Sequence, residues 1–337
     1  MAEPKPRTFK RTCFKALEIV VFTSMGIIDQ TLRVVGPFFV LFAVTLISGV
    51  IWAWFTYIMD AISEPGTLLR YFHLAIACSL IFNVAWNYFS TVFTPPGCTP
   101  EEYVQNEDME SGLVSKNDQG KYWDGFGRFC KKCRKPKPPR AHHCSICRKC
   151  VLKMDHHCPW VATCVGHRNY RTFYLFMFWL WVGCIYVMMT MGPMFLKNIH
   201  HRRGEKENGA VVFSFILAFS VSIAVGLLLS WHTYLILTAQ TTIEWYNNHL
   251  YRAEAKKRGQ VWLNQWDVGP ITNLQMVLST GDKPKNFLLW WLPSLLPPQG
   301  TGLTFPMRSA ARSAEEVPLN PIQPSPEIGG AVDARTD

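Results

Sequence analysis

Four long apolar blocks divide the chain, and polar segments separate them. Each block runs for more than about 20 residues with almost no charged position, which is the length that an α-helix needs to cross a bilayer. We place the spans at residues 37–59, 71–93, 173–196 and 211–237. The pattern therefore predicts an all-α polytopic membrane protein with four transmembrane helices.

The segments outside the spans differ in composition. Alternating apolar and polar residues at 14–35 indicate an amphipathic lead-in at the membrane surface. The apolar run 287–296 is too short to span a bilayer and is expected to lie in the interface. The non-spanning segments are an N-terminal segment 1–36, a polar linker 98–125, a cysteine-rich domain 126–172, a C-terminal region 238–296 and a Pro/Ser-rich, disordered tail 297–337.

Lys and Arg residues orient the predicted spans, because cytosolic loops carry an excess of them. Residues 98–171 hold 14 and residues 1–36 hold six, whereas the link 60–70 holds one and the loop 197–209 holds four. Both termini and the cysteine-rich domain are therefore predicted to be cytosolic. The net charge of +10 suits a protein that faces an anionic leaflet and polyanionic ligands.

A duplicated Cys/His pattern lies between the second and third spans. Seven of the 11 cysteines fall within residues 130–164, which indicates metal or thiol chemistry in a reducing compartment rather than disulfides. The pattern Cys-x2-Cys-x9-His-x6-Cys occurs twice, offset by 14 residues. Three thiols and one imidazole form a closed structural zinc site. The predicted ligands of two Zn²⁺ ions are Cys130, Cys133, His143 and Cys150, and then Cys144, Cys147, His157 and Cys164.

The seventh cysteine of this segment, Cys158, belongs to neither copy. It lies where a third copy would begin, but Val161 replaces the partner thiol, so that a third site cannot close. Asp155 and His156 also lie outside both ligand sets. A carboxylate, an imidazole and an unligated thiol are the parts of an activated cysteine nucleophile, in which His156 would be the base and Asp155 would hold its tautomer.

These motifs resemble the cysteine-rich domain of the DHHC-type protein S-palmitoyltransferases, without a gap. The resemblance rests on Cys130-x2-Cys133, Lys137-Pro138-Pro139-Arg140, His143-Cys144-x2-Cys147-x2-Cys150, Asp155-His156-His157-Cys158-Pro159-Trp160 and Cys164-Val165-Gly166-x2-Asn169.

Two motifs after the fourth span extend the resemblance. Thr241-Thr242-Ile243-Glu244 is similar to the family's Thr-Thr-x-Glu motif, although a threonine followed by an acid is also a common helix-start signal. The segment from Asn264 to Asn273 resembles the family's C-terminal motif, with Trp266 in place of the usual smaller aromatic residue.

The resemblance implies a protein S-acyltransferase of the Golgi or endoplasmic reticulum. Cys158 would attack fatty acyl-CoA, form an acyl-enzyme and pass the acyl group to cysteines of membrane-associated proteins. Both zinc ions would be structural. The candidates for contacts with CoA, by resemblance and by charge, are Arg128, Lys137, Arg140 and His142.

Other functions fit parts of the pattern. Paired Cys-x2-Cys units usually form a zinc module for nucleic-acid or protein binding in a soluble chain, but attachment to a membrane disfavours nucleic acid as a partner. A membrane-anchored zinc scaffold that recruits proteins without catalysis would give Cys158 no role. A transporter would need ionisable residues within its spans, and these spans hold almost none.

Several polar or small residues within the spans have alternative interpretations. In the family, a residue at the far end of the acyl cavity limits chain length, and an ungapped count from Cys158 places it at Gly183. Glycine there either leaves room for acyl chains longer than sixteen carbons or serves close helix packing. We interpret His232 as a polar helix-end residue rather than a ligand, and Asn83 and Asn87 as interhelical hydrogen-bonding residues.

Overall fold

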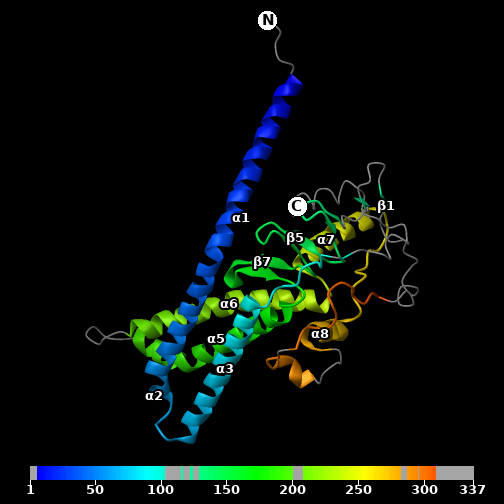
Figure 1. Cartoon of the computed structure of the whole chain (residues 1–337). Helices are drawn as coiled ribbons and strands as arrows, with labels where there is room; N and C mark the ends of the chain where they lie inside the picture. The colour runs from blue at the N-terminus through cyan, green and yellow to red at the C-terminus, as the bar shows by residue number, and fades with distance from the viewer. Residues whose placement is uncertain are drawn as a thin grey trace.

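The computed structural model describes residues 6–101, 103, 115–116, 122–123, 129–199, 208–281, 287–294 and 296–308. Within these ranges the chain is mostly helical, and four helices are long and apolar enough to cross a membrane. Short β-hairpins lie between the second and third of these helices in the sequence and beside one end of the helical bundle in space (Figure 1). The predicted fold class, four spans with a cysteine-rich domain between spans two and three, is confirmed.

The first helix is longer than the span predicted for it. α1 runs from Pro6 to Ala53 and continues through a π-helical turn, η1 (Trp54–Ile58), into α2 (Met59–Ile62). The lead-in expected at residues 14–35 is therefore continuous with the span, and in Figure 1 the N-terminal part of α1 extends away from the bundle. Contacts with the hairpins support this longer helix, since Gly36 packs on Ala162 and the Phe39 ring lies 5.2 Å from that of Trp160.

Helix α5 (Tyr170–Ile199) packs against both α3 (Leu68–Phe93) and α6 (Gly209–Leu237). Side-chain caps define where two of these helices begin. Thr67 accepts a hydrogen bond from the Arg70 amide at the start of α3, and Asn208 accepts one from the Val211 amide at the start of α6.

Polar side chains in the bundle bond partly across helices and partly within them. Trp54 Nε1 donates to Thr190 Oγ1 at 2.8 Å and links η1 to α5. Among the described residues, Asn83 and Asn87 bond within their own helix rather than across helices: Asn83 Nδ2 donates to the Ser79 carbonyl and Asn87 Nδ2 to the Asn83 carbonyl. That prediction is wrong because a side-chain amide readily reaches a carbonyl one turn earlier in its own helix.

The cysteine-rich domain is built from small antiparallel hairpins rather than helices. A two-stranded sheet in the linker precedes three hairpins that follow one another along the chain. The pairs are β1 (Ser115–Lys116) with β2 (Tyr122–Trp123), β3 (Phe129–Cys130) with β4 (Lys135–Pro136), β5 (His142–Cys144) with β6 (Lys149–Val151), and β7 (His156–Cys158) with β8 (Thr163–Val165). The 3₁₀ turn η2 (Pro159–Val161) lies in the last hairpin.

Helices α7 (Thr242–Lys257), α8 (Pro270–Leu278) and the 3₁₀ turn η3 (Phe287–Trp291) follow α6. Asn273 is buried and its Nδ2 donates to the Leu237 carbonyl at 2.9 Å, which fixes α8 to the end of α6. Arg171 at the start of α5 donates to the carbonyls of Leu278 and Trp290 at 2.8 and 3.0 Å. The C-terminal region is therefore held against the bundle.

The segment expected to be a disordered tail begins with an ordered stretch. Residues 296–308, which we call the strap, pair with the rest of the chain, as in the bridge between Thr280 and Pro298. The prediction of disorder from Pro297 onward is therefore wrong for residues 297–308. Gly302 and Phe305 both contact His167, and composition alone does not reveal such contacts. Residues 309–337, the loop 200–207 and most of the linker 98–125 lie outside the described residues.

Candidate active site and metal centres

The three hairpins of the cysteine-rich domain repeat one local structure. Arg134, Arg148 and Ala162 are spaced 14 residues apart, and all three have a positive φ, of 55°, 56° and 52°. In the first two hairpins the amide of this residue donates to the carbonyl of the first cysteine, Cys130 or Cys144, at 2.7 Å. The tight turn that results brings both thiols of each Cys-x2-Cys unit to one side.

The first predicted ligand set converges. His143 and Cys150 face each other across β5 and β6, while Cys130 and Cys133 come from the preceding hairpin. His143 Nδ1 lies 3.5, 3.2 and 4.0 Å from the sulfurs of Cys130, Cys133 and Cys150. Donors around a tetrahedral zinc ion at its usual bond lengths are roughly 3.5–3.8 Å apart, so that these four atoms fit one structural ion.

The second ligand set repeats this geometry one hairpin later. His157 Nδ1 lies 3.8, 3.3 and 3.6 Å from the sulfurs of Cys144, Cys147 and Cys164. His157 and Cys164 are cross-strand partners in β7 and β8. In each set, all four candidate ligand atoms lie within 4.8 Å of one another. The donor chemistry and the spacing both fit a closed Zn²⁺ site, which has no open position for substrate.

Cys158 occupies the corresponding position in the third hairpin, where Val161 stands in place of a second thiol. Its side chain lies outside both ligand sets, on β7. Alternate residues of a strand point to the same face, so that Cys158 shares its face with His156 while His157 points to the metal set. Strand geometry therefore separates the adjacent histidines, which the sequence could only assign from the repeat offset.

Asp155 and His156 form a close pair. His156 Nδ1 lies 2.7 Å from Asp155 Oδ2, and the Asp155 carboxylate is 1% exposed. Thr242, at the start of α7, donates its amide to Oδ1 at 3.0 Å and its hydroxyl to Oδ2 at 2.9 Å. Asp155 is thus a fully engaged acceptor, and it fixes the tautomer and the orientation of the imidazole.

The charges of this pair follow from its contacts. Burial opposes ionisation of Asp155, but the hydrogen bonds from His156 and Thr242 outweigh it and hold the pKa of this carboxyl below its usual range. Burial also opposes protonation of His156, yet Asp155 and the Cys158 sulfur outweigh it and raise the pKa of the imidazole to about 9. His156 is therefore protonated at neutral pH and has a proton that it can donate.

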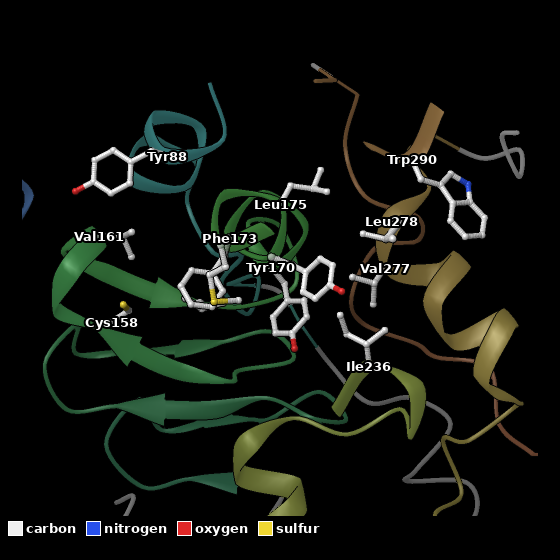
Figure 2. Close-up of a cluster of buried hydrophobic side chains, with 13 residues drawn as sticks. Tyr88, Cys158, Val161, Tyr170, Phe173, Leu175, Ile236, Val277, Leu278 and Trp290 are labelled. Atoms are coloured by element: carbon white, nitrogen blue, oxygen red, sulfur yellow. The ribbon is translucent and has the colours of Figure 1, made fainter. Parts of the chain in front are cut away.

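An apolar wall surrounds the thiol. Cys158 is 7% exposed and belongs to a buried cluster that includes Tyr88 of α3, Val161 and Phe173 of α5. Figure 2 shows Cys158 on its hairpin below Val161 and Tyr88, on the side that faces Phe173. Tyr88 Oη donates to the Trp160 carbonyl at 2.8 Å and fixes the turn that follows Cys158. The thiol therefore faces the membrane helices rather than open solvent.

Arg140 and Glu244 form a buried ion pair at the start of α7, the helix whose Thr242 binds Asp155. Arg140 donates Nε and a terminal nitrogen to the two carboxylate oxygens of Glu244 at 2.6 and 2.7 Å. Glu244 also accepts from the Thr241 amide at 2.9 Å and completes a capping box at the start of α7. The helix-start interpretation of Thr241 and Glu244 is confirmed, and the same cap aims Thr242 at Asp155.

Three of the four residues predicted to contact CoA fall within the described residues. Arg128 lies outside the described residues, and Lys137 is 4% exposed. His142 is half-buried on β5. Arg140 has only 4% of its side chain exposed and is paired with Glu244, and its contact with a CoA phosphate stays a prediction.

Two residues next to the pair were not assigned to the site from the sequence. His232 of α6 is 1% exposed, its ring centroid lies 5.8 Å from that of His156, and its Nδ1 is 3.0 Å from Tyr170 Oη. A candidate ligand atom of His232 also lies within 4.8 Å of those of Asp155 and His156. A histidine near the C-terminal end of an otherwise apolar span was the signal, but the helical pattern does not show which element it faces.

Known proteins are similar to this chain in sequence. The family model described as DHHC palmitoyltransferase matches residues 124–249. The chain is 36% identical to the Probable protein S-acyltransferase 16 of Arabidopsis thaliana over 239 residues, which are 69% of this chain and 78% of that protein. It is 30% identical to the Palmitoyltransferase ZDHHC15 of Homo sapiens over 299 residues, 80% of this chain and 83% of that protein. It is also 36% identical over 296 residues to the Putative ZDHHC-type palmitoyltransferase 4 of Dictyostelium discoideum, with 81% and 76% covered.

Proposed function

The chain belongs to the DHHC palmitoyltransferase family and is a protein-cysteine S-palmitoyltransferase, and on that premise we propose that it acts through an acyl-enzyme at Cys158. The observation that carries the proposal is the placement of this thiol. Cys158 lies outside both metal ligand sets, on the same strand face as His156, and against the membrane helices. A scaffold without catalysis would leave that arrangement unexplained.

The proposed first step is attack by the Cys158 thiolate on the thioester carbonyl carbon of fatty acyl-CoA. A bond forms between sulfur and carbon, and the bond to the CoA sulfur breaks. His156, protonated at neutral pH, gives its proton to the departing CoA thiolate. Asp155 keeps its charge and its hydrogen bond to His156 throughout, so that the imidazole stays in position.

The proposed second step reverses these roles on a cytosolic cysteine of a membrane-associated protein. His156, now neutral, takes the proton of the acceptor thiol, and the acceptor sulfur attacks the acyl-enzyme carbonyl. The acyl group leaves Cys158, which returns to the thiolate beside an imidazolium. No further reactant is needed, because one thioester replaces another in each step.

The predicted cofactors fit these roles. Two Zn²⁺ ions would be held by the two Cys₃His sets, and bound zinc would stabilise the hairpins that present Asp155, His156 and Cys158. Acyl-CoA is the proposed co-substrate, with its chain among the spans and with Arg128, Lys137, Arg140 and His142 as the proposed contacts of its phosphates. Residence in Golgi or endoplasmic reticulum membranes, with both termini in the cytosol, remains part of the proposal.

Autoacylation of the purified full-length chain tests the proposal. The protein is incubated with palmitoyl-CoA and analysed by intact mass and peptide mapping, with zinc measured on the same samples. We expect one hydroxylamine-sensitive acyl group on Cys158, and we expect Cys158→Ser to lose it while retaining two zinc ions. Cys98→Ser is the matched control, because that exposed cysteine lies outside both ligand sets and should leave labelling unchanged. Loss of a zinc ion from Cys158→Ser, or full labelling of this variant, would overturn the assignment.

A further inference from the structure

The strap, residues 296–308, is folded back onto the cysteine-rich domain and held at several points. His167 Nε2 lies 3.1 Å from the Gly300 carbonyl oxygen. Gly302 has a φ of +78°, and a Cβ there would lie 2.6 Å from His167 Cδ2, so that only glycine fits this close approach. The Arg308 amide donates to the Gln265 carbonyl at 2.8 Å. The strap thus has a defined path between these contacts.

The ring of Phe305, in the strap, packs against two basic and two aromatic side chains. Arg140 Cζ lies 4.9 Å from the ring centroid of Phe305, and Lys153 Nζ lies 5.9 Å from it. The rings of His167 and Trp266 meet Phe305 edge-on at centroid distances of 6.0 and 6.1 Å. One aromatic ring therefore contacts the Arg140 guanidinium and the amine of Lys153, and burial lowers the pKa of that amine to about 7.

Arg140 and Lys153 connect Phe305 to the pair formed by Asp155 and His156. The Arg140 guanidinium binds Glu244, whose capping box begins the helix from which Thr242 reaches Asp155. The Arg140 carbonyl accepts from the Met154 amide at 3.1 Å, one residue before Asp155. Lys153 precedes Met154. Arg140 is therefore linked to the carboxylate that orients His156 both by its side chain, through Glu244, and by its backbone, through Met154.

We propose that Phe305 is a positioning residue of the acyl transfer, which fixes Arg140 and Lys153 through its ring face and thereby holds Asp155 and His156 in line with Cys158. This inference rests on the proposed function. An aromatic ring suits the task because its face attracts a cation without competing with Glu244 for the guanidinium hydrogen-bond donors. On this proposal the strap contributes to the rate of acyl transfer.

The test is single-turnover autoacylation of the purified full chain with palmitoyl-CoA. We expect Phe305→Ala to lower the maximal rate constant by about tenfold or more, as loss of a desolvated cation–π contact would. The half-saturating palmitoyl-CoA concentration should change little, and both zinc ions should remain. Phe305→Trp, which keeps an aromatic face, should restore the rate, whereas Phe305→Leu, which keeps only apolar volume, should resemble Phe305→Ala.

Met307→Ala is the matched control, because Met307 lies in the strap two residues later and is 62% exposed; it should react at the wild-type rate. If Phe305→Leu reacts as fast as Phe305→Trp, the ring face has no positioning role and the proposal falls. The same comparison decides the question if Phe305→Ala loses zinc or aggregates. If the wild-type chain forms no acyl-enzyme at Cys158, the proposed function fails first; if it does and all Phe305 variants match it, only the strap proposal fails.

Discussion

At the scale of single residues, the site depends on where neighbouring side chains point along one short strand. His157 points to the second metal set, and His156 points to Asp155 and shares a face with Cys158. A shift of one residue in the register of β7 would exchange the two histidines. The cross-strand pair of His157 with Cys164 fixes that register, so that metal binding and placement of the nucleophile share one structural cause.

The two histidines should therefore respond differently to substitution. We expect His156→Ala to retain two zinc ions and to autoacylate slowly, since the thiol loses its proton partner. We expect His157→Ala to lose one zinc ion and the ordered hairpin with it. Zinc content by mass spectrometry and autoacylation rate, measured on the same preparations, check the pair; loss of metal from His156→Ala alone would exchange the assignments.

Thr242 allows a finer test of how Asp155 acts. Thr242→Val keeps the shape of the side chain and removes the hydroxyl that donates to Asp155 at 2.9 Å. A hydrogen bond to a charged group contributes about 1.5–3 kcal/mol, so that we expect autoacylation to slow by roughly 10- to 100-fold. Thr31→Val, at an exposed position of α1, is the control. An unchanged rate would show that the Thr242 amide alone suffices to hold the carboxylate.

At the scale of elements, the start of α7 joins the C-terminal region to the cysteine-rich domain. Glu244 completes the helix cap and pairs with Arg140, and the Glu244 side chain is only 12% exposed. Burial opposes the charge of Glu244, but Arg140 and the Thr241 amide outweigh it and hold the pKa of the Glu244 carboxyl below its usual range. The helix cap therefore depends on the negative charge of Glu244, which Arg140 and the Thr241 amide stabilise.

Glu244→Gln should destabilise this junction. Removal of one partner from a buried ion pair typically costs about 3–5 kcal/mol, because the remaining charge is left without compensation. We expect a lower thermal midpoint and faster proteolysis near α7, while both zinc ions stay bound. Glu254→Gln is the control on the same helix, because its pairs with Lys257 and Arg258 are largely exposed and its loss should have no measurable effect.

Much of this structure could be predicted at the level of elements, and the limits have physical causes. Apolar block length identified four spans, and the 14-residue offset identified the eight residues that converge in two clusters. Long-range side-chain partners could not be predicted, because neither periodicity nor spacing encodes them. Arg140 was a candidate phosphate contact by resemblance and by charge, and its pairing with a carboxylate 104 positions away in the sequence could not be predicted.

At the scale of the whole molecule, the surroundings of Gly183 bear on how long an acyl chain the proposed enzyme would accept. Gly183 lies in the middle of α5, and a Cβ built there would meet nothing within 4 Å among the described residues. Gly226 differs, since a Cβ there would lie 2.9 Å from Trp181 Nε1. Of the two interpretations of Gly183, open space therefore fits better than close helix packing.

Gly183→Tyr should consequently shorten the preferred acyl chain. We expect the wild type to use eighteen-carbon acyl-CoA nearly as well as sixteen-carbon acyl-CoA in direct competition, and we expect the variant to discriminate against the longer chain. Gly49→Tyr, at an exposed glycine of α1 with similarly open surroundings, should leave the preference unchanged. If the wild type already rejects the longer chain and Gly183→Tyr has no effect, the end of the cavity lies elsewhere.

The hairpin β5–β6 has a further consequence, because it belongs to both metal clusters at once. It gives His143 and Cys150 to one set and Cys144 and Cys147 to the other. Binding the first ion would order half of the donors for the second, so that loading should be cooperative, with a Hill coefficient above one and few half-loaded molecules in native mass spectra. A chelator would then switch the enzyme off over a narrow range of free zinc concentration, as a threshold rather than a gradual decline.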